Sequence, residues 1–210
     1  MYDVLLGITS FLIATKMDEY YSADIDKLCH LTQDSFSPQD VRSMELRILR
    51  LVDFQVYGTE PMTFIHRFLM AADRTNDVMA LHLSTLCMDA LMPLMKLWSE
   101  KTQLKAAASV FTALLLLKFK DEDNANDPDF EEIWTPNLRY YAWHDHHELF
   151  PMSHYVLTML KRILLDKDDK AYALTTKYLS QSRHHGLLSQ GFLCVANVQT
   201  VLAFVETHEF

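Results

Sequence analysis

Apolar residues recur along this chain with the spacing of helices, and no convincing run alternates between apolar and polar residues as a strand does. The 210 residues include only 4 glycines and 6 prolines, whereas leucine, methionine and alanine are abundant. Few turn-forming residues and many strong helix formers favour helices throughout. We therefore predict an all-α protein.

The first predicted helix, residues 3–17, has no charged residue between Leu5 and Ile13. Such a segment is typical of a helix that is buried on nearly all sides. It ends abruptly in Lys16, Met17, Asp18 and Glu19. A solvent-exposed helix end explains these charges simply, because long charged side chains usually reach water. A binding surface at the tip of a buried helix is the alternative, and the residues alone favour the simpler explanation.

Helix-start signals organise the rest of the chain. Ser22 or Asp24 can cap a short helix, and Ser37 is suited to the N-cap of a third helix with Pro38 at its first position. Residues 57–61 combine glycine and proline and are predicted to be a linker. Beyond them, helical patterns cover residues 62–73, 77–92, 102–118, 145–165 and 168–180, with an acidic loop at 120–132 and a further helix start at Thr135 and Pro136.

Charge and cysteine content exclude several classes of protein. A formal net charge of −9 argues against a nucleic-acid-binding surface, which needs a basic face. The three cysteines form no C-x-x-C pair, so neither a disulfide framework nor a zinc ribbon is indicated, and a reducing compartment is expected. We expect no secretion signal, and the longest apolar run, residues 110–117, is too short to cross a membrane.

Residues 143–148 (WHDHHE) are rich in histidine and suggest either a metal site or an HD-type phosphohydrolase. Zinc would need side chains that converge on one point, for example His144 and Glu148, four positions apart, together with at least one remote ligand. Asp145 is equally well explained as an N-cap, with Glu148 three residues later completing a capping box. No nucleophile elbow, glycine-rich phosphate loop or pair of carboxylates is visible. We therefore expect no catalytic site, cofactor or metal.

Residues 7–56 resemble the later part of the N-terminal cyclin box. That family typically shows an apolar, alanine-containing helix that ends in a lysine and two acids. A tyrosine, an aspartate–serine/threonine–aromatic step and a methionine–glutamate pair then follow. The corresponding residues are Lys16, Asp18, Glu19, Tyr21, Asp34, Ser35, Phe36, Met44, Glu45 and Phe54. Two residues depart from the pattern: the family's arginine is displaced by one position, to Arg42, and Met17 stands where an aromatic residue is often found.

Later segments resemble the C-terminal cyclin fold; they are residues 64–92, 104–116, 134–143 and 176–186. The third of these is similar to animal mitotic B-type cyclins. The resemblance implies an all-α cyclin fold with a partial N-terminal cyclin box at 1–57, a C-terminal cyclin domain at 58–189 and a tail at 190–210. The acidic insert at 120–132 is longer than usual. The box begins at what would be its third helix, so we expect either a fragment or a protein without the family's substrate-docking patch and destruction motif.

The resemblance also implies a function. Cyclins are non-catalytic subunits that bind and activate a cyclin-dependent serine/threonine kinase, and the B-type members act in G2/M control of the cell cycle. In them, the lysine that corresponds to Lys16 reaches backbone carbonyls at the kinase's regulatory C helix, and the glutamate that corresponds to Glu45 holds it. The resemblance therefore favours a binding surface at Lys16.

The apolar part of this surface would be supplied by Ile13, Met17, Leu49 and Phe54. The expected partner is a cyclin-dependent kinase, with no nucleic acid and no membrane, and the expected location is the nucleus and cytoplasm. Two alternatives stay open. One is a cyclin-fold scaffold or transcription adaptor that activates no kinase, and the other is an inert truncated fragment.

Overall fold

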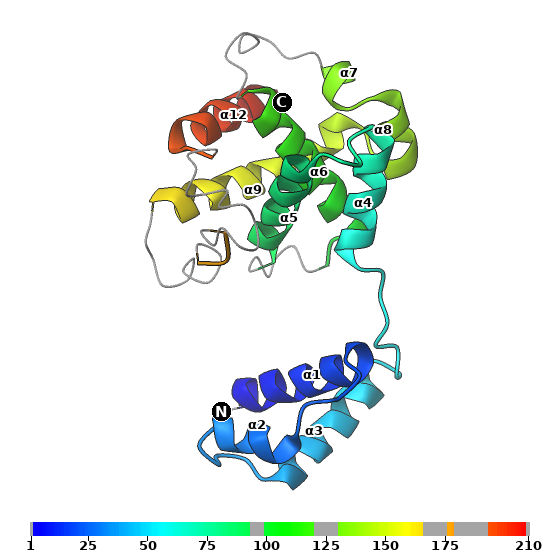
Figure 1. The fold of residues 1–210 in the computed structure, drawn as a ribbon, viewed down its shortest axis with the longest axis vertical. Coiled ribbons are helices and arrows are strands. Elements are labelled where there is room, and N and C mark those ends of the chain that lie inside the picture. The colour runs from blue at the N-terminus through cyan, green and yellow to red at the C-terminus, as the bar shows by residue number, and fades with distance from the viewer. Residues whose placement is uncertain (1, 93–98, 120–129, 166–175, 179–192, 209–210) are drawn as a thin grey trace. The chain divides into compact units, whose positions relative to one another are not determined.

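The computed structural model describes residues 2–92, 99–119, 130–165, 176–178 and 193–208. Every regular element in these ranges is an α-helix, which confirms the predicted all-α fold (Figure 1). The chain divides into two compact units, Met1–Gly58 and Thr59–Phe210, and each has its own apolar core. Within the described ranges, no helix combines the length and apolar character needed to cross a membrane.

The first unit contains α1 (Tyr2–Asp18), α2 (Ile25–Leu31) and α3 (Pro38–Leu51). Of the two caps considered for α2, the structure uses Asp24, which accepts a hydrogen bond from the Asp26 N–H at 3.0 Å. At α3, Ser37 and Asp40 form a reciprocal capping box. Each cap provides acceptors for backbone N–H groups that a helix start leaves without partners. The starts of α2 and α3 are thus set by local side-chain chemistry.

Helix α1 is buried on one face only, in contrast to the expected burial on nearly all sides. Leu5, Thr9 and Leu12 are buried, whereas Leu6 and Phe11 are 48% and 54% exposed. Within its unit, α1 packs mainly on α3, and this contact covers a single stripe of the helix. The absence of charge therefore shows that α1 tolerates burial, but it does not determine how much of the helix is covered.

The second unit is built around α6 (Thr102–Lys118), which packs against α4 (Pro61–Ala71), α5 (Val78–Leu91) and α9 (His146–Leu165) (Figure 1). The whole stretch of α6 from Ala106 to Leu116 is buried, because its residues are apolar or small on every side. The hydroxyls of Ser109 and Thr112 each donate to the carbonyl four residues earlier, at 2.8 Å. These bonds satisfy the polar groups that α6 places inside the core.

Two short helices precede α9. They are α7 (Phe130–Ile133) and α8 (Pro136–Ala142), and the latter is capped by Thr135 with Pro136 at its first position, as expected. The α4 helix begins at Pro61, which is the last residue of the segment predicted as a linker. Most of the acidic loop expected at 120–132 and most of the helix expected at 168–180 lie outside the described residues.

The expected tail at 190–210 is wrong for most of its length, because residues Val195–His208 form helix α12. Val198, Val201 and Val205 are fully buried, and α12 packs against α9. These valines recur at the three- and four-residue spacing that places side chains on one helix face. The C-terminal segment is therefore part of the core of the second unit.

Candidate functional site

The ion pair between Lys16 and Glu45 joins the two long helices of the first unit. Lys16 is in the last turn of α1, where its positive charge also interacts favourably with the helix dipole. Its Nζ lies 2.5 Å from Oε1 of Glu45, which is in the middle of α3. The side chain of Lys16 is 42% exposed and that of Glu45 is 15% exposed. Glu45 is therefore the fixed member of the pair, and Lys16 presents its remaining donors to solvent.

The segment that follows α1 is held close to this pair by Thr15. Its hydroxyl donates to the Leu12 carbonyl at 2.9 Å and accepts the Ala23 N–H at 3.1 Å. The chain between α1 and α2 is thereby tied back to the last turn of α1, directly beside Lys16. This role of Thr15 was not predicted from the sequence. The available signal was a hydroxyl-bearing residue inside an otherwise apolar helix end.

The four apolar residues predicted to accompany the pair lie on the same two helices or just beyond them. Ile13 and Met17 are one turn apart on α1, with Ile13 half-buried and Met17 exposed. Leu49 is half-buried one turn after Glu45. Phe54 follows α3 with φ of 60° and is 62% exposed, and its N–H donates to the Leu49 carbonyl at 2.8 Å. The structure thus joins Lys16 directly to Glu45 and leaves Met17 and Phe54 available on the surface.

Other exposed apolar side chains adjoin this region in the sequence. Leu46, next to Glu45, is 44% exposed, and Tyr20 and Tyr21 are largely exposed with their rings in edge-to-face contact at 4.8 Å. Aromatic and apolar side chains around a polar pair are typical of a surface that binds another protein. We define the proposed binding surface as Lys16, Glu45, Ile13, Met17, Leu49 and Phe54.

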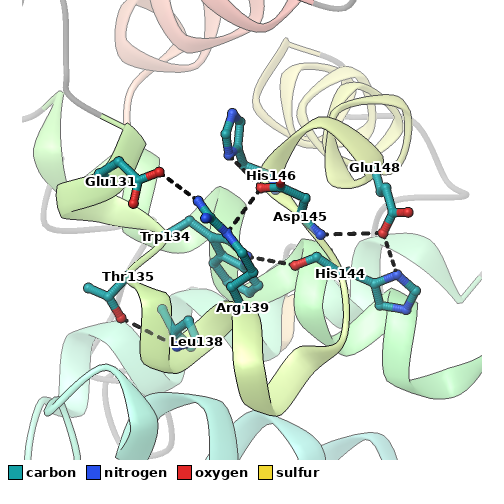
Figure 2. A network of polar contacts seen from close by, with 9 residues as sticks. All are labelled: Glu131, Trp134, Thr135, Leu138, Arg139, His144, Asp145, His146 and Glu148. Carbon is teal, nitrogen blue, oxygen red and sulfur yellow. Dashed lines mark hydrogen bonds and ion pairs between the residues drawn. The ribbon is translucent and has the colours of Figure 1, made fainter.

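The histidine-rich segment forms a polar network that connects α7, α8 and the start of α9 (Figure 2). Arg139 lies at its centre, with Glu131 at 2.7 Å and Asp145 at 3.3 Å. The hydrogen bond to Glu131 raises the pKa of Arg139. Burial alone would raise the pKa of Asp145, but the His146 N–H and nearby positive charges lower it on balance. The network therefore stabilises charged forms of both residues.

His144 and Glu148 also have partners within this segment. Nδ1 of His144 lies 2.8 Å from Glu148, whose carboxylate also accepts the Asp145 N–H at 3.3 Å (Figure 2). One half of the expected capping box is thus present, while Asp145 itself accepts from the His146 N–H. In the described part of the chain, no group of three or more His, Cys, Asp or Glu side chains is arranged to hold a metal ion. The geometry favours a structural role for this segment.

His146 lies among aromatic rings. Its imidazole stacks on Phe130 with centroids 5.0 Å apart and rings 5° from parallel, and it also contacts Phe150. Burial lowers the pKa of His146, and the neighbouring His147 and Arg139 act in the same direction, against Asp145. The neutral imidazole is therefore the form that suits this site.

Comparison with known proteins gives matches over both units. The family model described as the cyclin N-terminal domain matches residues 4–57, and the model described as the cyclin C-terminal domain matches residues 59–190. Cyclin-A2-3 of Arabidopsis thaliana is 32% identical over 145 residues, which cover 66% of this chain and 29% of that protein. G2/mitotic-specific cyclin-B1 of Carassius auratus is 28% identical over 188 residues, which cover 85% of this chain and 41% of that protein.

A third relative shows the same pattern of coverage. G2/mitotic-specific cyclin-B of Drosophila melanogaster is 26% identical over 160 residues, or 75% of this chain and 29% of that protein. The chain thus spans well under half the length of the curated relatives it matches.

Proposed function

The chain belongs to the cyclin family, and from that premise we propose that it binds and activates a cyclin-dependent serine/threonine kinase. Cyclins are regulatory subunits of kinases and supply no catalytic group themselves. We further propose a role in G2/M control, which the mitotic B-type relatives support, although A-type cyclins are similar to this chain at comparable identity. Action on such a kinase would place the protein in the nucleus and cytoplasm.

The observation that carries this proposal is the Lys16–Glu45 ion pair at the end of α1. An ammonium group has three donors, and Glu45 takes one of them. The other two can bind backbone carbonyls at the end of the kinase's C helix. Because Glu45 already orients Lys16 in the free protein, little conformational entropy is lost when the kinase binds.

The mechanism follows from selective binding to one kinase conformation. A protein kinase is active when the lysine–glutamate ion pair that involves its C helix is formed. If Lys16 and the apolar residues around it bind the C helix only in its inward position, the binding energy shifts the kinase population toward the active state. The transferred phosphoryl group never contacts this chain.

The test adds the purified chain to a cyclin-free cyclin-dependent kinase and measures phosphorylation of a peptide substrate. We expect phosphorylation to rise with the wild-type chain and with Lys101→Glu, an exposed control on the second unit. Lys16→Glu should abolish the rise, because it places a second acid beside Glu45. A chain that neither binds nor activates the kinase would instead support a cyclin-fold scaffold or adaptor. Equal activation by wild type and Lys16→Glu would show that Lys16 does not carry the interaction.

A further inference from the structure

A cavity of about 460 Å³ lies between α4 and α8, within the second unit. Its lining residues come from the second half of α4, the turn after it, and α8; they are Arg67, Met70, Ala71, Asp73, Asn137 and Tyr141. We call the surface that these residues form the α4–α8 groove. Two of its residues, Arg67 and Asp73, carry opposite charges and are exposed to solvent.

Arg67 presents a cation with unused donors. Its guanidinium lies over the ring of Tyr141, with Cζ 4.9 Å from the ring centroid. Stacking on a ring leaves the N–H groups at the edge of a guanidinium free to bind a carboxylate. Arg67 forms no ion pair with any residue that the structure describes. It is therefore an oriented site for an acidic group.

The carboxylate of Asp73 is also without a partner among the described residues. Asp73 follows α4 with φ of 57°, in the left-handed region that aspartate adopts more readily than most residues, and its N–H donates to the Met70 carbonyl at 3.1 Å. The adjacent cation, Arg74, pairs instead with Asp77 at 2.8 Å. The groove thus carries one positive and one negative group, and neither is neutralised by the other or by a described neighbour.

Large apolar side chains are exposed in the groove and next to it on α8. Met70 is 63% exposed and Tyr141 is 42% exposed. The ring of Tyr140, which is 74% exposed, meets that of Tyr141 edge to face with centroids 5.3 Å apart. Trp143, at the end of α8, is 83% exposed. Tyrosine, tryptophan, methionine and arginine are enriched where proteins bind one another, so this composition is typical of a protein-binding surface.

The two charges determine which kind of partner fits the groove. A partner with charge of a single sign would be attracted by one of the two residues and repelled by the other. An unrelated protein would need an acid and a base at the same separation as Arg67 and Asp73. A second copy of this chain meets that requirement by identity, because the two-fold axis of a symmetric dimer exchanges the positions of the two groups whatever distance separates them.

We propose that the α4–α8 groove is a self-association surface through which two copies of this chain form a two-fold symmetric dimer. Arg67 of each protomer binds Asp73 of the partner subunit, so one contact occurs twice, and Met70 and Tyr141 pack on their symmetry mates. The groove has far fewer residues than the roughly 20–30 that each partner contributes to a standard interface. The dimer is therefore weak and reversible, and its two exposed ion pairs make it weaker still as salt is added.

The experiment is analytical ultracentrifugation of the purified full chain over a micromolar concentration series, which measures the dissociation constant of the dimer. We expect a monomer–dimer equilibrium for the wild type. Arg67→Glu and Asp73→Arg should each raise the dissociation constant about tenfold or more, because each places like charges opposite one another at both contacts. The exposed controls Arg162→Glu and Glu100→Arg change the net charge by the same amounts and should leave it nearly unchanged.

An equimolar mixture of Arg67→Glu and Asp73→Arg tests the symmetry directly. In a heterodimer of these two variants, the introduced glutamate faces the introduced arginine, and the native Asp73 of one chain faces the native Arg67 of the other. Both contacts are then attractive. The mixture should dimerise with about the affinity of the wild type, although neither variant does so alone. The double variant should also dimerise, because it exchanges the two charges without removing either.

Circular dichroism on each variant checks that the helices are intact, and if one single variant unfolds, the other and the double variant still report on the groove. A wild-type chain that remains monomeric would overturn the proposal and leave the groove to a different protein. Single variants that dimerise like the wild type would also overturn it, since dimers formed through other exposed residues, such as Phe11 on α1, would persist in them. A mixture that stays monomeric would do the same. No kinase is present in these measurements, so their failure leaves the proposed function untouched.

Discussion

Replacing the two charged residues of the proposed binding surface by alanine should affect the free protein and a kinase complex very differently. The variants are Lys16→Ala, Glu45→Ala and their combination, with Lys101→Ala as an exposed control. In the free protein, Lys16 is 42% exposed and water can replace much of its interaction with Glu45. Solvent-exposed ion pairs contribute about 0–1 kcal/mol. The first unit should therefore lose no more than about 1 kcal/mol of stability in any variant.

In the complex, the same groups would be removed from water. Cutting back one member of a buried, hydrogen-bonded charge pair typically costs about 2–5 kcal/mol, because the other member is left without a partner. Each single variant should thus weaken kinase binding by roughly 30-fold or more. The double variant should lose clearly less than the sum of the two, since both groups act as one unit.

Two measurements separate these effects. Titration calorimetry with a cyclin-dependent kinase gives the dissociation constants, and hydrogen exchange in α1 and α3 gives the stability of the first unit. Tryptophan fluorescence is unsuitable for the latter because Trp98, Trp134 and Trp143 all belong to the second unit. Equal dissociation constants for all four variants would refute the reasoning and leave Lys16 as a charged end of a helix. Strict additivity would mean that Lys16 and Glu45 bind the kinase independently.

Three further predictions concern stability and surface chemistry. Val201→Ala should lower the free energy of unfolding of the second unit by about 1.5–3 kcal/mol, because it removes two buried methyl groups and leaves a cavity. Thr200→Ala, on the exposed face of α12, should change the same free energy by less than about 0.5 kcal/mol. Urea titrations followed by tryptophan fluorescence measure both variants, and equal effects of the two would contradict the packing of α12. Because burial lowers the pKa of His146, the unfolded chain binds more protons there. The contribution of His146 to stability should be full above its unfolded pKa of about 6.5 and be lost as the pH falls below that value, and His146→Gln should reduce this pH dependence. Urea titration at each pH measures it, and the same pH dependence in wild type and His146→Gln would rule out this histidine as the cause. Phe11→Gln should reduce the fluorescence of a hydrophobic dye bound to the chain, since it removes a large exposed ring from α1; unchanged fluorescence would place the dye elsewhere.

Helix starts that are set by residues close together in the chain could be predicted from the sequence. The cap of α3 needs only Ser37 and Asp40, and the start of α8 needs only Thr135 and Pro136. Each cap is a bond between residues within three positions, so its chemistry is fixed before any helix packs against another. The choice of Asp24 over Ser22 at α2 was left open, because both side chains can accept the same kind of bond.

Burial was harder to predict because it depends on which segments meet. The uncharged stretch of α1 predicted burial on nearly all sides, yet α3 covers only one stripe of it. The opposite error occurred at α12, where the resemblance to cyclins ended near residue 189 and the segment beyond it was considered a tail. The periodic valines at 198, 201 and 205 already indicated a buried helix face. For this segment, the spacing of apolar residues predicts burial better than the extent of the resemblance does, because the spacing is a property of the helix itself.

The candidate site depends both on local sequence signals and on the packing of helices against each other. Helical spacing places Lys16 at the end of α1 and Glu45 beside the apolar stripe of α3, but the two residues are 29 positions apart, and spacing cannot bring them together. Their contact depends on how α1 crosses α3, which is set by Leu5 and Leu12 packing with Val41 in the shared core. The resemblance to cyclins predicted the pair, because in that family the glutamate that corresponds to Glu45 holds the lysine that corresponds to Lys16. The core of the first unit therefore determines the geometry of the proposed binding surface, and a substitution such as Leu12→Ala should separate Lys16 from Glu45 without altering either residue.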